Sequence, residues 1–291
     1  MMSTAFICAT CGAQFPPSAE APPECLICCD SRQFIGLDGQ QWTTLGELGR
    51  KHRNVIQQEE PGLYSIHTEP HFAIGQRAFL LQTPQGNLLW DCLALLDQPT
   101  IDRVRDLGGI AAIAISHPHY YTSMVEWSIE FDNAPIYLHS ADRQWVTRSN
   151  SSVQHWSGDS RNLLDDLVLI HTPGHFDGFQ VLLWPQGAAG KGVLLSGDQP
   201  QVCLDTRWVS FIQLSELRSA RGACRRRDRG SARTLPIPSH LRCVSEADRR
   251  GGCEECRAPL SRAIYSGACG VVAKKPARKS RRISCRTEVR A

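Results

Sequence analysis

The stretch IAAIAISHPHYY, residues 110–121, decides the fold class because an apolar run passes directly into two histidines. Residues 110–115 are all aliphatic, as expected of a strand buried on both faces of a sheet. His117 and His119 follow at a spacing of two. If the backbone stays extended there, as Pro118 favours, both imidazoles lie on one side of the chain. The stretch therefore predicts a buried strand with half a metal site at its end.

Two later strand ends carry residue types that would complete this site. An apolar run over residues 167–170 leads into HTPGH, which ends at His175, and a run over residues 192–195 leads into SGD, which ends at Asp198. The glycine in each turn permits a tight change of direction. Three imidazoles and one carboxylate suit zinc, and also iron or manganese. We therefore expect these four side chains to converge on a metal ion.

Strands and helices are mixed around these motifs. We expect strands at residues 63–67, 73–82, 87–91, 110–115, 135–139, 167–170, 180–184 and 192–195. We expect helices at residues 99–107, from Thr122 or Ser123 to 131, and from 140 to about 146. Such mixing, with polar residues collected at strand ends, indicates a layered α/β domain.

A second set of candidate ligands lies near the N-terminus. Cys8 and Cys11 form one C-x-x-C pair, and Cys25 and Cys28 form another after 13 intervening residues. Four thiolates at this spacing can close a tetrahedral site without a hydrophobic core. Because four thiolates leave no open position, we expect a structural ion, bound separately from the histidine site. Cys29 is expected to be a spare thiol.

The net charge of +3 averages two unlike parts of the chain. Residues 1–212 contain 12 Lys and Arg and 22 Asp and Glu, whereas residues 213–291 contain 20 and 7. Of the 21 aromatic residues, only Tyr265 lies in the second part. Low hydrophobicity with high net charge is typical of a chain that cannot offset its ordering entropy by burial. The boundary near residue 212 is therefore the sharpest in the sequence.

These features divide the chain into four parts: a four-Cys metal knuckle at 1–40, a linker at 41–61, the layered domain at 62–212 and a basic tail at 213–291. Arg outnumbers Lys by 27 to 5, which suggests a GC-rich gene. Out-of-frame reading of such a gene gives a composition like that of the tail. We hypothesise that the tail is disordered or follows a change of reading frame near residues 212–215. Translation of the other two frames tests the second alternative.

Residues 62–212 resemble a metallo-β-lactamase-fold hydrolase. That family has an H-x-H-x-D-H motif after a buried strand, a later histidine in a T-P-G-H-like turn and an aspartate in a G-D motif. The matching residues here are His117, His119, His175 and Asp198, and Asp91 resembles an early aspartate just outside the ligand shell. The knuckle resembles rubredoxin-type modules that bind zinc or iron. The resemblance implies an αββα sandwich, here incomplete at the C-terminus because the likeness stops near residue 212.

One departure concerns the number of metal ions. Tyr121 and Thr122 stand where the family has the aspartate and histidine that build a second metal position. A phenol, with an unperturbed pKa of about 10, is a poor zinc ligand at neutral pH. We therefore expect one ion at the three histidines, with Asp198 as a fourth ligand or as the base that orients a water.

The resemblance implies metal-dependent hydrolysis of an ester, thioester, amide or phosphoester bond in a small-molecule substrate. A three-histidine metal with an open position lowers the pKa of a bound water to about 7. Asp198 would orient that water or take its proton. Tyr120 or Tyr121 could donate to a developing oxyanion, although both rings are more simply explained by packing.

Two rival functions follow from other features. The chain could be a non-catalytic relative whose metal is structural or absent, as Tyr121 and Thr122 would favour. It could also bind nucleic acid through the basic tail, but the tail lacks the aromatics of a base-stacking surface, so we rank this last. No basic segment followed by an apolar one marks a secretory signal, and no apolar run reaches about 18 residues. We therefore expect a cytoplasmic protein without a membrane span.

Overall fold

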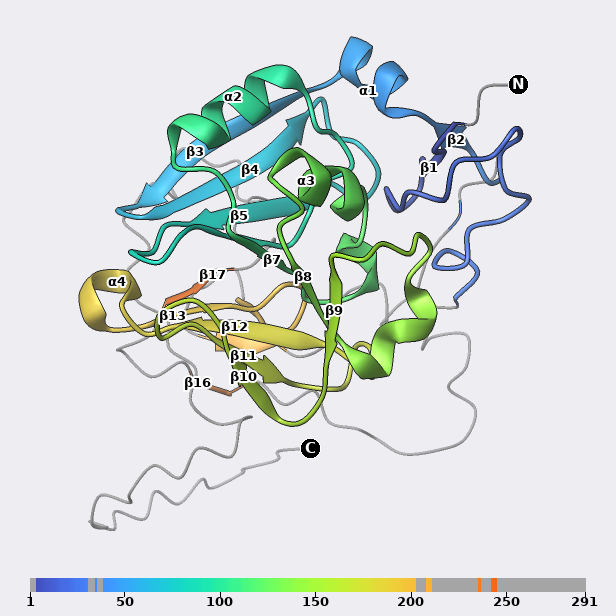
Figure 1. Ribbon diagram of the computed structural model, residues 1–291. Coiled ribbons are helices and arrows are strands. Elements are labelled where there is room, and N and C mark those ends of the chain that lie inside the picture. Colours follow the sequence, from blue (N-terminus) through green and yellow to red (C-terminus); the bar gives the residue numbers. More distant parts are fainter. Residues whose placement is uncertain are drawn as a thin grey trace, which may run out of the picture.

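The computed structural model describes residues 4–30, 35, 39–202, 208–210, 235–236 and 242–244. These residues form two facing β-sheets, with helices packed on the outer face of one sheet (Figure 1). The layered α/β architecture expected from the sequence is confirmed. Figure 1 shows α2 (Gln98–Asp106) and α3 (Met124–Glu130) on this outer face.

The larger sheet has seven strands. In order across it they are β3 (Arg53–Glu60), β4 (Leu63–Glu69), β5 (Arg77–Leu81), β6 (Leu88–Trp90), β7 (Ala112–Ala114), β8 (Ile136–His139) and β9 (Val153–Trp156). The strands from β3 to β6 are antiparallel neighbours, whereas those from β6 to β9 are parallel. Parallel pairing requires crossover connections, and α2 (Gln98–Asp106) and α3 (Met124–Glu130) lie in the first two of these.

The second sheet has five strands: β10 (Ser160–Asn162), β11 (Val168–His171), β12 (Gln180–Trp184), β13 (Val193–Leu195) and β17 (Arg242–Val244). Two small sheets accompany it. They are formed by β1 (Ile7–Cys8) with β2 (Trp42–Thr43), and by β14 (Gln201–Val202), β15 (Trp208–Ser210) and β16 (Leu235–Pro236). The remaining helical elements are α1 (Leu45–Lys51), α4 (Gly187–Gly190) and the 3-10 helices η1 (Pro118–Tyr120) and η2 (Ser140–Trp145).

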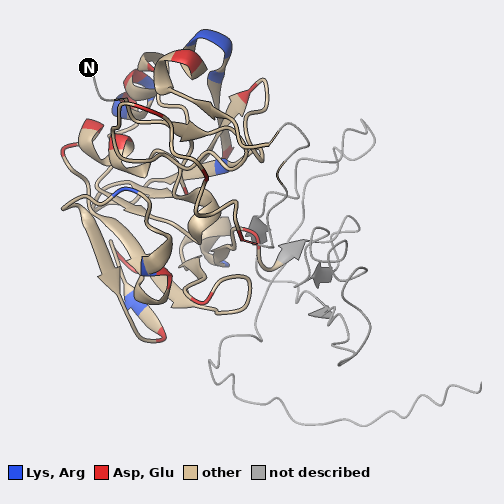
Figure 2. Ribbon diagram, turned by 90° about the vertical axis from the view of Figure 1, so that its right-hand side faces the viewer, with Lys and Arg blue, Asp and Glu red and all other residues tan. Residues whose placement is uncertain are grey.

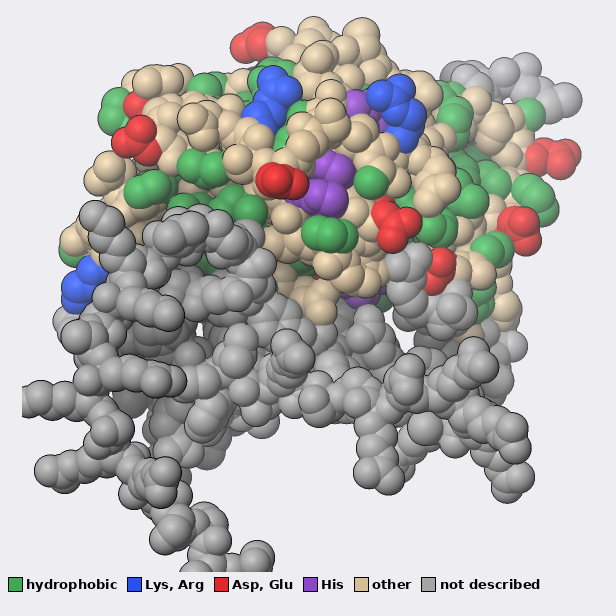
Figure 3. All heavy atoms as spheres, turned by 90° about the horizontal axis from the view of Figure 1, so that it is seen from below, with side chains coloured by type: hydrophobic (Ala, Val, Ile, Leu, Met, Phe, Trp, Pro, Cys, Tyr) green, Lys and Arg blue, Asp and Glu red, His purple; other side chains and the backbone are tan. Residues whose placement is uncertain are grey.

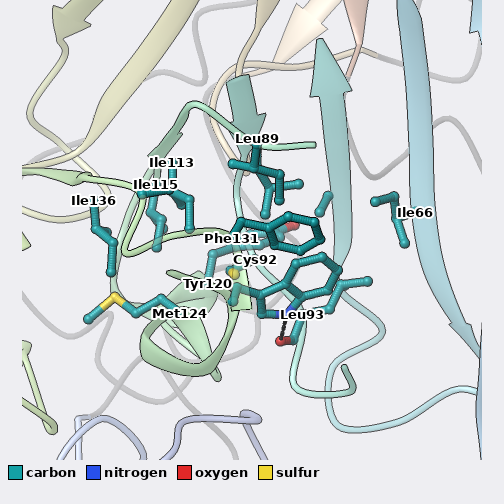
Figure 4. Packing of buried hydrophobic residues seen from close by; sticks show 14 of the residues in the cluster. Ile66, Leu89, Cys92, Leu93, Ile113, Ile115, Tyr120, Met124, Phe131 and Ile136 are labelled. Carbon is teal, nitrogen blue, oxygen red and sulfur yellow. Dashed lines mark hydrogen bonds between the residues drawn. The ribbon is translucent and has the colours of Figure 1, made fainter. Parts of the chain in front are cut away.

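The strand β7 is buried on both faces, as its unbroken aliphatic sequence predicts. Ile113 belongs to the apolar cluster beneath the helices (Figure 4). Ala112 and Ala114 belong instead to the cluster between the two sheets. Because successive side chains of a strand alternate between faces, this one strand contributes to both cores and is held firmly in place.

The helix α2 begins and packs as its sequence predicts. The Asp97 side chain accepts a hydrogen bond from the backbone N–H of Thr100 at 3.1 Å, and a proline follows in the first turn. Both features favour a helix start. Ile101 and Val104 are then buried against the larger sheet.

Several sequence expectations need correction. Residues 41–61, expected as a linker, form α1 and the edge strand β3. The sequence of β3 is mostly polar because one side of this edge strand is exposed, so it lacks a clear strand pattern. Residues 73–76 precede β5 rather than belonging to it, and 140–145 form a 3-10 helix.

The tail hypothesis falls almost wholly outside the described residues. Within 213–291 the structure describes only β16 and β17, and β17 pairs in parallel with β13. No helix in the described part of the chain is both long enough and apolar enough to cross a bilayer.

We predict that Trp127→Ala destabilises the domain by about 3–5 kcal/mol. The Trp127 side chain is fully buried in the apolar cluster between the helices and the larger sheet, and its indole N–H donates to the carbonyl of Leu93 at 3.0 Å. The substitution leaves a cavity and an unpaired carbonyl. Chemical denaturation of the purified protein measures the change in the free energy of unfolding.

The control is Ile129→Ala on the same helix. Ile129 is 48% exposed, so its substitution should change the free energy of unfolding by less than about 0.5 kcal/mol. Equal losses in the two variants would contradict this description of the core.

Candidate metal centres

Four buried side chains converge where strands of the two sheets end. His117 and His119 follow β7, His175 lies between β11 and β12, and Asp198 follows β13. Each offers one ligand atom, and these atoms all lie within 4.8 Å of one another. The structure therefore brings together the four residues that the sequence singled out.

The backbone does not stay extended through the H-x-H motif, contrary to the expectation from the sequence. His117 is extended, with φ −167° and ψ 172°, but Pro118 begins the 3-10 helix η1. The fixed φ of proline suits the first position of a helical turn, which is why the extended segment ends there. The turn still keeps the ring centroids of His117 and His119 5.2 Å apart.

Gly197 allows the Asp198 loop to approach the histidines. Its φ of +55° lies in the left-handed region, and a Cβ atom there would lie 2.6 Å from the Ser116 hydroxyl oxygen. Any other residue would force the two loops apart. Glycine is therefore needed to bring the carboxylate within reach of the imidazoles.

The charges of the group favour a cation. The Asp198 Oδ2 atom lies 3.3 Å from Nε2 of His117 and 3.8 Å from Nε2 of His175. Burial raises the pKa of Asp198, but the nearby imidazoles of His117 and His175 outweigh it and hold the pKa below its usual range. An ionised carboxylate among three imidazoles is a donor set that fits a divalent metal ion such as zinc.

Asp91 and Ser116 form a second layer behind His117. Asp91 Oδ1 accepts hydrogen bonds from the backbone N–H and the hydroxyl of Ser116, both at 2.7 Å. The Ser116 hydroxyl also lies 2.9 Å from Nδ1 of His117. Since the hydroxyl proton points to Asp91, Nδ1–H of His117 donates to Ser116 Oγ. The ligating lone pair is then on Nε2, the atom that faces Asp198.

The early aspartate thus lies just outside the ligand group, where the resemblance implies it should be. Burial raises the pKa of Asp91 to about 8 and outweighs the two hydrogen bonds from Ser116, which lower it. Sequence reasoning missed Ser116, because a serine beside a histidine has no distinctive pattern of its own. Its position directly before the H-x-H motif was the one available signal.

Tyr120 and Tyr121 lie in the core beneath the helices. Both are almost fully buried, and the Tyr120 ring packs 5.2 Å from the His117 ring. Burial also raises the pKa of the Tyr121 phenol, which keeps it protonated and unsuited to bind a metal ion. These surroundings favour packing over contact with a substrate.

The four-Cys group is a second compact cluster. The Sγ atoms of Cys8 and Cys28 are 3.6 Å apart, as are those of Cys11 and Cys25. A tetrahedral zinc with Zn–S distances of about 2.3 Å requires sulfur atoms about 3.8 Å apart, so the spacing fits a metal ion. Hydrogen bonds among the four cysteines lower the pKa of Cys8 and Cys25, whereas the pKa of Cys11 and Cys28 is raised, so protons are shared within the cluster.

Charged and histidine side chains are unevenly distributed on the surface. Lys and Arg residues, blue in the ribbon of Figure 2, lie at separate places along the described part of the chain. Figure 3 shows histidine side chains gathered near the middle of one face, with acidic and basic side chains around them. The nucleic-acid alternative rests on the basic tail, which lies almost wholly outside the described residues.

We predict that Cys25→Ser lowers the metal content from two ions per chain to one, because three thiolates no longer close the tetrahedron. The ion at the histidine group should remain bound. Cys29→Ser is the matched control, since Cys29 is exposed and should be replaceable without loss of metal. Elemental analysis of the purified proteins gives the result. A wild-type protein with one ion, none of it lost on substitution of Cys25, would contradict the four-Cys assignment.

Comparison with known proteins places the chain in a family. No protein-family model matches it. Among curated proteins, it is 51% identical to the uncharacterized protein YmaE of Bacillus subtilis (strain 168) over 209 residues, which cover 71% of this chain and 76% of YmaE.

Similar solved structures include the DIM-1 metallo-β-lactamase exposed to ceftazidime, at 12% identity and a TM-score of 0.44, over 53% of this chain and 73% of that one. A Cronobacter sakazakii metallo-β-lactamase is 22% identical, with a TM-score of 0.39 over 49% and 61% of the two chains. An AiiA mutant of B. thuringiensis with bound N-decanoyl-L-homoserine is 18% identical, with a TM-score of 0.38 over 51% and 75%. On its sequence identity over most of both chains, the protein belongs to the same family as B. subtilis YmaE.

Proposed function

We propose that the protein is a metal-dependent hydrolase that cleaves an ester, thioester, amide or phosphoester bond in a small-molecule substrate. The observation that supports this most directly is the convergence of three buried imidazoles and one carboxylate within 4.8 Å. Held there, a zinc, iron or manganese ion would lower the pKa of a water and polarise the bond to be cleaved. Zinc suits the three nitrogen ligands best.

Each residue of the group has a distinct task in this proposal. His117, His119 and His175 hold the ion through their ring nitrogens. Asp91 and Ser116 keep the His117 ring in one orientation: the Ser116 hydroxyl donates to Asp91 Oδ1, and Ser116 Oγ accepts from Nδ1–H of His117.

Asp198 acts on the attacking water or completes the ligand set. The surrounding imidazoles hold its pKa below the usual range, so the carboxylate is ionised at neutral pH. It can therefore accept a hydrogen bond from a water and fix the direction from which that water approaches. The low pKa makes Asp198 a weak base, so orientation is the larger part of its role.

The four-Cys knuckle is proposed to bind a structural zinc or iron ion, within a module of residues 1–40. We assign the catalytic domain to residues 41–212, since β3 is the edge strand of its larger sheet and Leu48 of α1 packs against Ala94 and Leu95. We also propose that the protein works in the cytoplasm, where thiols stay reduced and four clustered cysteines remain available to metal.

A non-catalytic role is the main alternative. A protonated phenol and a threonine hydroxyl are poor metal ligands, so Tyr121 and Thr122 do not supply the second metal position that the resembled family has there. A relative of this kind would bind one ion at the histidines and hydrolyse nothing. Metal analysis together with a broad screen of ester, thioester and phosphoester substrates separates the two functions, because only the hydrolase turns over a substrate in a chelator-sensitive manner.

We predict that His117→Ala and His175→Ala each remove the metal ion from this group and abolish hydrolysis. Loss of one imidazole leaves too few strong ligands for tight binding. The control is His155→Ala, a partly buried histidine of β9 outside the ligand group. Metal content and turnover in the substrate screen are the two measurements. Full metal retention in both ligand variants would exclude this assignment.

We predict a different outcome for Asp198→Asn, which removes charge while preserving shape. Most of the metal should stay, whereas kcat should fall by about 10²- to 10⁴-fold, as expected when the group that positions the attacking water is lost. Tyr121→Phe should keep both metal and activity because the phenol is buried and protonated. If Tyr121→Phe released the metal as fully as His117→Ala does, the ligand assignment would be wrong.

A further inference from the structure

We propose that the Gln76 side chain couples the four-Cys group to the histidine group, an inference that rests on the metal sites proposed above. Gln76 is buried and directly precedes β5. Its Nε2 atom donates to the backbone carbonyl of Cys11 at 2.6 Å and to that of His119 at 2.9 Å. An amide nitrogen carries two N–H donors, so one side chain satisfies both carbonyls. A single amide group therefore joins one candidate ligand residue of each group.

The backbone of the knuckle also lies directly against the turn that carries His119. Gly12 has a φ of +80°, and a Cβ atom there would lie 3.3 Å from Cγ2 of Thr122 and 3.4 Å from Nε2 of Gln76. The backbone N–H of Gln14 donates to the Thr122 carbonyl at 3.1 Å. The knuckle is thus linked to two backbone carbonyls of this turn. It reaches the His119 carbonyl through Gln76 and the Thr122 carbonyl directly, and Tyr120 and Tyr121 lie between these two residues.

A polar network extends this contact toward α3. Gln14 Nε2 donates to Glu126 at 3.2 Å, and Arg148 donates both to Gln14 and to Glu126. The hydroxyl of Thr147 donates to the Gln14 carbonyl at 2.7 Å. These contacts fix the knuckle on the domain, so that Cys11 cannot shift without disturbing its neighbours.

The consequence is energetic coupling between the two groups. An ion bound by four thiolates orders the loop from Cys8 to Cys11, and with it the Cys11 carbonyl that Gln76 contacts. Gln76 then holds the His119 carbonyl, and so reduces the freedom that His119 must lose when it binds an ion. Coupling of this type is reciprocal and typically changes affinity by about 5- to 150-fold. Gln76 is therefore a positioning residue that acts through His119.

Cobalt(II) titration of the full-length protein tests this proposal without reference to catalysis. Thiolate ligands give cobalt(II) intense charge-transfer absorption in the near ultraviolet, whereas imidazole and carboxylate ligands give only weaker visible bands, so the two sites are followed separately. Gln76→Met keeps the length of the side chain and removes its donors. The matched control is Gln82→Met, because Gln82 Nε2 also donates to a backbone carbonyl, that of Leu107 at 2.8 Å.

The expected result is specific to the histidine site. In Gln76→Met the thiolate bands should stay close to those of the wild type, whereas the unfolding midpoint should fall modestly because two buried carbonyls lose their donor. The cobalt affinity of the histidine site should fall by about 5- to 10-fold, as expected for the loss of a hydrogen bond. Gln82→Met should leave both sites unchanged, and Gly12→Ala, which pushes the knuckle away, should weaken the histidine site as Gln76→Met does.

A double-mutant cycle with Cys25→Ser completes the test. Cys25→Ser should itself weaken the histidine site by a similar factor, and the double variant should be no weaker than the worse single variant. Additive losses, an unchanged affinity in Gln76→Met, or loss of both cobalt signals in that variant would each overturn the coupling. A wild-type protein with no cobalt at the histidine group would instead reject the proposed function itself.

Discussion

The burial of β7 on both faces is the constraint on which the candidate site depends. Its three residues pack into the helix-side core through Ile113 and into the core between the sheets through Ala112 and Ala114. A strand held from both sides cannot slide or rotate without exposing apolar surface. The residues that leave its end, from Ser116 to His119, therefore emerge at a fixed point, and Asp91 fixes the first of them through two hydrogen bonds.

The sequence predicted the structure best where a buried apolar strand leads into polar, chemically reactive side chains. The unbroken aliphatic run predicted β7, and β12 begins and ends where its apolar pattern does. The convergence of the four candidate ligands was predictable because histidines and carboxylates that follow buried strands are costly to bury unless they are paired or bind an ion. The edge strand β3 was not predictable, since exposure on one side leaves a polar sequence. Ser116 was missed because its role depends on Asp91, which is distant in the sequence, and Gln76 was missed because its side chain contacts backbone carbonyls that no local pattern encodes.

The two candidate centres differ in the ions that they favour. Four thiolates form a soft, closed site, whereas three imidazoles and a carboxylate form a harder one. The chain keeps the two sets apart in sequence, since all four cysteines precede residue 29 and all four members of the other group follow residue 116. Which site an ion prefers would therefore depend on the chemistry of the ligands. The two sites can coexist although the knuckle packs directly against the His119 turn.

The ligands of the histidine group come from both layers of the sandwich. His117 and His119 extend from the larger sheet, and His175 and Asp198 from the smaller one. An ion held between them would be a cross-link joining the two layers, and it would be present only in the folded chain. At a free metal concentration of 100 times the dissociation constant, such a cross-link adds about 2.7 kcal/mol to the free energy of unfolding. The lifetime of the protein in a cell would then follow the supply of metal, so that starvation for the ion would lower its abundance as well as its activity.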